Sequence, residues 1–142
     1  WIRDALANGE LDLAARLLGR PYSMSGRVRY GQQLGRTIGY PTANILPDRN
    51  ACPLSGIYVV TLRGISEFPL PGVASVGTRP TVNGKGVIVE VHLFDFHRDI
   101  YGKMVEVEFR EKLRDELRFD SVEEMTVQID DDAARARAYF VQ

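Results

Sequence analysis

The sequence is poor in cysteine and in long hydrophobic runs, and it has no excess of charge of either sign. Its single cysteine, Cys52, excludes an internal disulfide and is typical of a reducing compartment, so we expect a cytoplasmic protein. No apolar run approaches the roughly 20 residues of a membrane-spanning helix, and no secretory signal is present. The formal net charge is −1. This composition predicts neither a nucleic-acid partner nor a membrane partner.

What the sequence does contain is typical of one globular domain. Its 142 residues are 44% hydrophobic and 26% charged, enough to bury a core. The chain begins at Trp1, without an initiator Met, inside a segment that already has a helical pattern. We therefore expect this chain to be the C-terminal portion of a longer protein.

Two short helices are expected at the N-terminus. Residues 1–8 have the pattern of a helix that ends at Asn8 and Gly9, since both residues tolerate left-handed backbone geometry. The segment 10–19, "ELDLAARLLG", has apolar residues at helical spacing. Gly19 ends this second helix, and Pro21 prevents its continuation.

From residue 22 onward the pattern changes to the alternation of β-strands. Five segments have strand character: 22–31, 56–64, 71–77, 86–96 and 103–113. Parallel strands need long crossovers, and none are available here, so the sheet should be antiparallel. A small closed barrel would leave no exposed edge strand. In the last segment Glu106 and Glu108 alternate with apolar residues, and we expect both on the surface.

The final element is predicted to be a helix over residues 119–140. Ser121 and Glu124 form a capping box at its start. Five apolar residues form one stripe that should pack against the barrel: Val122, Met125, Ile129, Ala133 and Ala136. The acidic run 130–132 is expected to form a solvated face of this helix.

The stretch "GRTIGYPTAN", residues 35–44, is rich in glycine and small polar residues. Together with Gly31, the glycines make a pliable loop that can approach a phosphate closely, and Arg36 can contact that phosphate. The segment 31–37 is one residue shorter than a P-loop, has Arg in place of Lys and leads into no helix, which argues against a P-loop. A plain surface connection built from turn residues remains the alternative.

Within this stretch, "PTAN" contains candidate metal ligands. In an extended chain Thr42 and Asn44 point to the same side. They would offer a hydroxyl and an amide oxygen, hard ligands that suit Mg²⁺, which fills its other positions with phosphate oxygens and water. The alternative is a turn in which both side chains only satisfy the backbone.

Glu90 is the candidate general base. It lies in the apolar segment 86–94, "GVIVEVHLF", where a buried and unpaired carboxylate would be costly. Glu90 therefore either points to solvent or takes part in chemistry. His92 shares its face and His97 follows, but the sequence offers no convincing third zinc ligand. No Ser-His-Asp arrangement stands out either.

Taken together, these motifs resemble the riboflavin kinase family. The resemblance covers residues 17–140 and rests on six segments in this order: "GRTIGYPTANI", "GIYVV", "GVASVGTRPTV", "VEVHLFDF", "DIYGKMVEVEF" and "LRDELRFDSVEEM". The nearest form is the C-terminal kinase module of the bacterial bifunctional riboflavin kinase/FMN adenylyltransferase, the prokaryotic FAD synthetase. The resemblance implies a six-stranded antiparallel Greek-key barrel with a C-terminal helix. It also implies transfer of the γ-phosphoryl group from MgATP to the ribityl 5′-hydroxyl of riboflavin, giving FMN and ADP.

The resemblance further implies a domain organisation. Residues 1–20 would be a helical linker from an upstream FMN adenylyltransferase domain, and residues 21–142 the kinase domain. This chain alone would then make FMN but not FAD.

The resemblance also implies roles for individual residues. Glu90 would accept the proton of the substrate hydroxyl, and Thr42 and Asn44 would contact Mg²⁺ and the nucleotide phosphates. The other ATP-binding positions would be Gly31, Arg36, Gly39, Leu93 and Tyr101. The flavin-binding positions, near the start of the last helix, would be Arg114, Asp120, Val122 and Glu123.

Two other classes of function remain to be weighed. One is a flavin- or nucleotide-binding barrel without catalysis, such as a regulatory domain; the intact set of Thr42, Asn44 and Glu90 argues against it. The other is a nucleic-acid-binding barrel, which needs a basic groove lined with aromatic residues. The balanced charge and the lack of such a stripe argue against that class.

Overall fold

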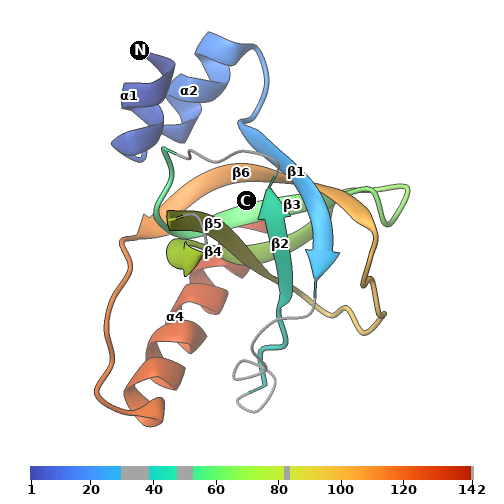
Figure 1. Ribbon diagram of the computed structural model, residues 1–142, viewed down its shortest axis with the longest axis vertical. Helices are drawn as coiled ribbons and strands as arrows, with labels where there is room; N and C mark the ends of the chain where they lie inside the picture. The colour runs from blue at the N-terminus through green and yellow to red at the C-terminus, as the bar shows by residue number, and fades with distance from the viewer. Residues whose placement is uncertain (30–38, 48–52, 82–83, 142) are drawn as a thin grey trace.

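A closed antiparallel β-barrel forms the body of the protein (Figure 1). The computed structural model describes residues 1–29, 39–47, 53–81 and 84–141. Within them, six strands are β1 (Ser23–Arg29), β2 (Ala43–Pro47), β3 (Gly56–Arg63), β4 (Leu70–Thr81), β5 (Gly84–Leu93) and β6 (Met104–Arg114). They close in the order β1-β2-β5-β4-β3-β6. Because β3, β4 and β5 are neighbours and β6 returns beside β3, these four strands form a Greek key. The predicted barrel is confirmed.

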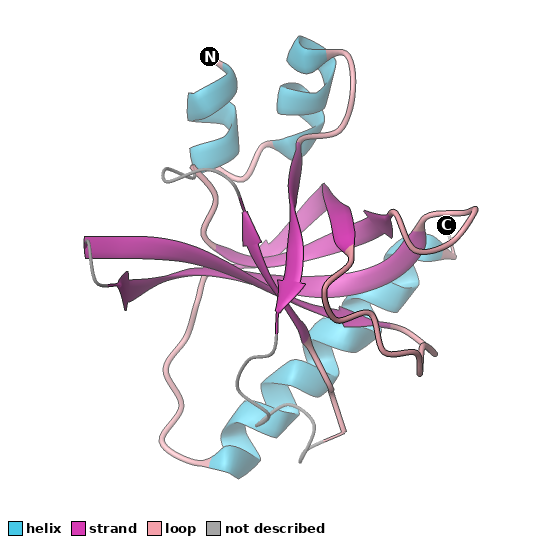
Figure 2. Cartoon of the chain, turned by 45° about the vertical axis from the view of Figure 1, so that its right-hand side comes forward, coloured by secondary structure: helices cyan, strands magenta, loops and turns pink. Residues whose placement is uncertain are grey.

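Three helices accompany the barrel in the described residues: α1 (Ile2–Ala7), α2 (Leu11–Leu18) and α4 (Val122–Phe140). Helices α1 and α2 lie together at one end of the barrel, and α4 runs along its outside (Figure 2). Gly19 ends α2 in the left-handed conformation, with φ of 78°, as predicted. The capping box is also present, because Ser121 Oγ accepts a hydrogen bond of 3.1 Å from the Glu124 amide.

Strand β5 shows how the alternating pattern places residues inside and outside the barrel. Val89, Val91 and Leu93 are buried in the interior core, whereas Glu90 and His92 are half-buried on the outer face. The same alternation buries Val105, Val107 and Phe109 of β6. The outer face of β5 is therefore where polar side chains of the barrel become available for a site.

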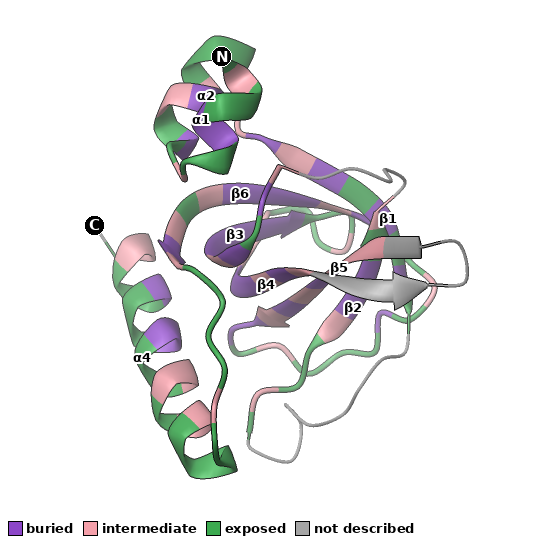
Figure 3. Cartoon of the chain, turned by 60° about the vertical axis from the view of Figure 1, so that its left-hand side comes forward, coloured by how far each residue is buried: buried purple, intermediate pink, exposed green. Residues whose placement is uncertain are grey.

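A second, smaller core joins α4 to the outside of the barrel. Val59, Val73 and Leu113 pack against Ala133 and Ala136 of the helix. The small alanine side chains let the helix approach the strands closely. Figure 3 shows the buried part of α4 in its C-terminal half.

The rest of the predicted apolar stripe is not buried in this second core. Met125 and Ile129 are half-buried, and Val122 is 49% exposed. Only the C-terminal half of α4 therefore packs tightly on the barrel.

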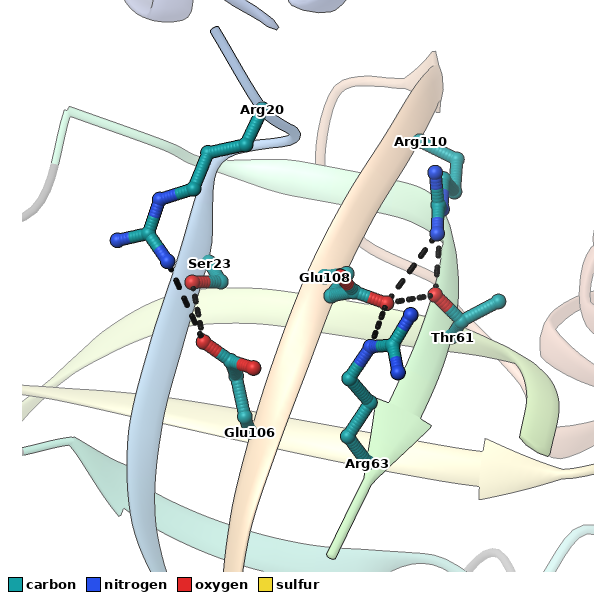
Figure 4. A network of polar contacts seen from close by, with 7 residues as sticks. All are labelled: Arg20, Ser23, Thr61, Arg63, Glu106, Glu108 and Arg110. Atoms are coloured by element: carbon teal, nitrogen blue, oxygen red, sulfur yellow. Dashed lines mark hydrogen bonds and ion pairs between the residues drawn. The ribbon is translucent and has the colours of Figure 1, made fainter. Parts of the chain in front are cut away.

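The expectation that Glu108 lies on the surface is wrong. Its side chain is buried on the outer face of the barrel, where its Oε1 accepts a 2.9 Å hydrogen bond from Thr61 of the neighbouring strand. The same oxygen pairs with Arg63 at 2.9 Å and with Arg110 at 3.2 Å (Figure 4). The arginine stems cover the carboxylate while their charges neutralise it, so burial does not leave it unpaired. Glu106, by contrast, is half-buried.

Candidate active site

A cleft of about 620 Å³ lies between the outer face of the barrel and α4. Its volume is in the range of small-ligand sites. The strand side contributes four polar side chains: Thr42, Ser75, Glu90 and His92. The β6–α4 connection and the helix contribute four apolar ones, Leu117, Phe119, Met125 and Ile129, together with the charged Glu116, Arg118 and Asp132. The cleft therefore suits a ligand that has an apolar body and a polar reacting end.

The barrel register brings the predicted catalytic and metal-binding residues onto one face. Glu90 of β5 lies directly opposite Asn44 of β2 and opposite Ser75 of β4. Residues directly opposite each other in an antiparallel pair project to the same side. Thr42 comes two residues before Asn44, and like Glu90 it lines the cleft. The structure thus brings together the residues that the sequence singled out, and their roles remain predictions.

Asn44 has a buried oxygen that suits a cation. The side chain is 8% exposed, although it is on the outer face of the barrel. Among the described residues, its Oδ1 has no hydrogen-bond partner. A buried carbonyl without a partner is costly, which makes this atom a ready ligand. With the Thr42 hydroxyl and the Glu90 carboxylate, Asn44 offers oxygen ligands of the kind that Mg²⁺ takes.

The two histidines do not form a zinc site in the described part of the chain. No three His, Cys, Asp or Glu residues gather there in a way that would hold a metal ion. His92 Nδ1 lies 2.9 Å from the carbonyl oxygen of Pro41. Since a carbonyl can only accept, this nitrogen carries a hydrogen and donates it. His92 therefore supports the segment that leads to Thr42.

A buried ion pair forms the far wall of the cleft. The Arg114 guanidinium binds Asp132 through two nitrogens, with Nε–Oδ1 at 2.9 Å and Nη2–Oδ2 at 2.7 Å. Gln128 Nε2 donates a further 3.1 Å hydrogen bond to Asp132. The expectation that the run 130–132 is solvated is wrong for Asp132, which is 3% exposed. Its side chain points toward the end of β6, where Arg114 neutralises it.

Breaking this ion pair should destabilise the protein. We expect Asp132→Ala to lower the free energy of unfolding by roughly 3–5 kcal/mol, because it leaves the buried Arg114 charge uncompensated. Chemical denaturation followed by circular dichroism measures the loss. Asp131→Ala is the matched control, since Asp131 is exposed and carries the same charge. Equal stability of the two variants would contradict a structural role for the pair.

On the opposite side of the cleft, Tyr40 connects the start of β2 to α4. Its hydroxyl donates a hydrogen bond to the Asp130 carboxylate. This hydrogen bond is the main reason why the pKa of Tyr40 is raised to about 12, and burial of the phenol raises the pKa further. The phenol therefore stays a neutral donor throughout the physiological range. Asp130 is exposed, as predicted for this run, although its carboxylate accepts this hydrogen bond.

Of the remaining predicted ATP-binding positions, the structure describes Gly39, Leu93 and Tyr101. Gly39 has a φ of 90°, a left-handed conformation that favours glycine. Leu93 is buried in the barrel core, and Tyr101 is 47% exposed on the β5–β6 connection, so neither lines the cleft. Gly31 and Arg36 lie outside the described residues.

The predicted flavin-binding positions divide into two groups. Arg114 lines the cleft, whereas Asp120, Val122 and Glu123 are exposed where α4 begins and do not line it. Sequence reasoning missed Phe119, which does line the cleft. Its signal would have been an aromatic residue in an otherwise charged connection.

The fold and the site define a closed Greek-key barrel with an oxygen-rich cleft under a C-terminal helix. Comparison with known proteins agrees on one family. The sequence model of the riboflavin kinase family matches residues 18–140. The bifunctional riboflavin kinase/FMN adenylyltransferase of Haemophilus influenzae is 52% identical over 139 residues, which cover 98% of this chain and 45% of that protein. The chain thus spans less than half the length of the curated relatives that it matches.

Two solved structures share the fold. The crystal structure of riboflavin kinase from Trypanosoma brucei superposes with a TM-score of 0.61 at 25% identity, covering 86% of this chain and 81% of that one. A crystal structure from Streptococcus pneumoniae, described as a macrolide-efflux protein, has a TM-score of 0.83 at 42% identity and covers 92% of this chain and 43% of that one. Within the described residues, no helix combines the length and apolar character needed to cross a bilayer. The chain belongs to the riboflavin kinase family.

Proposed function

We propose that this chain is a riboflavin kinase, which transfers the γ-phosphoryl group of ATP to the ribityl 5′-hydroxyl of riboflavin. The observation that carries the proposal is the position of Glu90. It is half-buried in the cleft and lies directly opposite Asn44, whose buried oxygen has no partner among the described residues. Phosphoryl transfer needs a positioned base and positioned ligands for phosphate charge, and little else from the protein.

Glu90 is the proton acceptor in this proposal. The proton of the 5′-hydroxyl passes to the Glu90 carboxylate as the new O–P bond forms. The bond between the γ-phosphorus and the bridging oxygen breaks, and ADP leaves with that oxygen. The products are FMN and ADP.

Thr42 and Asn44 are the proposed ligands of the Mg²⁺ that accompanies ATP. When bound, this ion neutralises the charge that develops on the phosphate oxygens. Through this ion, the hydroxyl of Thr42 and the amide oxygen of Asn44 would hold the nucleotide phosphates near Glu90. Because Gly39 has no side chain, the nucleotide can approach the backbone closely at this position.

The apolar side of the cleft would bind the flavin ring. Phe119, Met125 and Ile129 offer an apolar surface for an aromatic ring, while the polar strand side faces the ribityl chain. Arg114 lies at the edge of this surface, with its guanidinium held by Asp132. The exposed flavin-binding candidates, Asp120, Val122 and Glu123, would contact the ligand from the start of α4. Leu93 and Tyr101, which do not line the cleft, stay candidates for ATP binding, as do Gly31 and Arg36, which lie outside the described residues.

The domain organisation follows the bifunctional relatives. We infer that residues 1–20 connect the kinase domain, residues 21–142, to an FMN adenylyltransferase domain in a full-length cytoplasmic protein. The bifunctional relatives are about twice the length of this chain, which supports the inference.

The direct experiment tests FMN formation. We expect the purified chain to convert riboflavin to FMN in the presence of MgATP, and not to convert FMN to FAD. Chromatography of the flavins after incubation measures both reactions. The Glu90→Gln variant, purified in the same way, controls for a contaminating kinase. Riboflavin binding without FMN would instead identify a binding barrel, and FAD formation would refute the domain assignment.

A further inference from the structure

We propose that Tyr40 is a positioning residue for nucleotide binding, which holds Thr42 in place through a hydrogen bond to Asp130 of α4. This inference rests on the proposed function, because it takes Thr42 as a ligand of the metal–nucleotide complex. Tyr40 acts through Thr42, and its own hydroxyl does not contact the reacting atoms.

Thr42 lies just outside the strand pairing of the barrel. It lies immediately before Ala43, the first residue of β2, and so outside the pairing with β5. Its position therefore depends on what holds the two residues before it. Pro41 is held by β5, because its carbonyl accepts the 2.9 Å hydrogen bond from His92 Nδ1. Tyr40 is held by α4, because its hydroxyl donates to Asp130.

Tyr40 is contacted both by strand β5 and by helix α4. Its ring meets the His92 ring edge-on, with the centroids 5.1 Å apart. The His92 ring meets Phe94 in the same way at 5.9 Å. Arg137 of α4 in turn lies over the Phe94 ring at 4.3 Å. Tyr40 is thus fixed both by the helix and by the face of β5 that carries Glu90.

The turn of α4 that carries Asp130 is also attached to the barrel. Asp132, two residues after Asp130, is bound to Arg114 in the far wall of the cleft. The same turn of α4 therefore contacts both sides of the cleft. A carboxylate is also a strong acceptor for the Tyr40 hydroxyl. The contact can fix Thr42 because the helix turn that carries Asp130 is attached to the barrel through Asp132 and Arg114.

The test is a set of substitutions that remove the hydrogen bond between Tyr40 and Asp130 and keep the aromatic rings. Tyr40→Phe keeps the ring that lines the cleft and removes only the hydroxyl. We expect the dissociation constant for MgADP to rise by about 10–100-fold, the usual effect of losing a residue that orients a metal ligand. The KM for MgATP should rise with it, while riboflavin affinity stays within about threefold of the parent. Asp130→Asn should reproduce these effects, and Asp131→Asn, the exposed neighbour, should not.

A second comparison separates positioning from a general structural role. In a Thr42→Ala background, Tyr40→Phe should have no further effect on MgADP affinity, because the ligand that it positions is gone. A further loss of affinity in that background, or an unchanged MgADP affinity in Tyr40→Phe alone, would overturn the inference. A loss of riboflavin affinity equal to the loss of MgADP affinity would also overturn it. FMN formation by the parent is measured first. If the parent forms no FMN, the proposed function is wrong. If it does form FMN, the results with the variants test only the role of Tyr40.

Discussion

Replacing Glu90 with Gln is expected to lower kcat by roughly 10²–10⁴, the usual contribution of a general base. A primary hydroxyl is a poor nucleophile while it holds its proton, and Gln cannot accept that proton. Gln keeps the size of the side chain and remains compatible with β5. MgATP affinity should therefore change little, because the substitution affects the acceptor side. Steady-state kinetics of FMN formation, with calorimetry of MgADP binding, measure both quantities.

The matched control for this variant is Glu111→Gln. Glu111 is an exposed strand carboxylate of β6 outside the cleft, so its loss should leave kcat unchanged. If Glu90→Gln folds, binds both ligands and turns over within a few-fold of the parent, Glu90 is not the base. The polar side of the cleft would then need another role.

Removing the metal ligands is the second substitution with a large expected effect. Thr42→Ala and Asn44→Ala should each weaken MgADP binding and lower turnover by about 10³-fold, because charge neutralisation by a bound metal is worth several kcal/mol. The free protein should tolerate Asn44→Ala, since Oδ1 has no hydrogen bond to lose among the described residues. Calorimetry with and without EDTA measures how much of the nucleotide affinity depends on the metal.

Ser25→Ala is the control for these two variants. It removes an exposed strand hydroxyl of β1 that lies outside the cleft, so the dependence of nucleotide binding on Mg²⁺ should not change. If Thr42→Ala and Asn44→Ala both retain the affinity and activity of the parent, the metal assignment is wrong. Phosphate binding would then have to be explained by other residues.

The sequence alone determined the architecture and one face of the site. The alternation in β5 placed Val89 inside and Glu90 outside, and the capping box located the start of α4. These features are local, because the repeat of a strand and the geometry of a helix start depend on residues a few positions apart. An extended chain puts Thr42 and Asn44 on one side for the same reason. The riboflavin kinase motifs then indicated what such a face is for.

The tertiary structure decided which charged residues are buried and which residues share the cleft. The patterns around Glu108 and Asp132 are those of surface residues, yet both are buried, because arginines from elsewhere in the fold reach them. Tyr40 and Asp130 are 90 positions apart in sequence and meet only when α4 packs on the barrel. A charge can be buried when an opposite charge lies within reach, and that depends on the packing of distant segments rather than on neighbours in the chain.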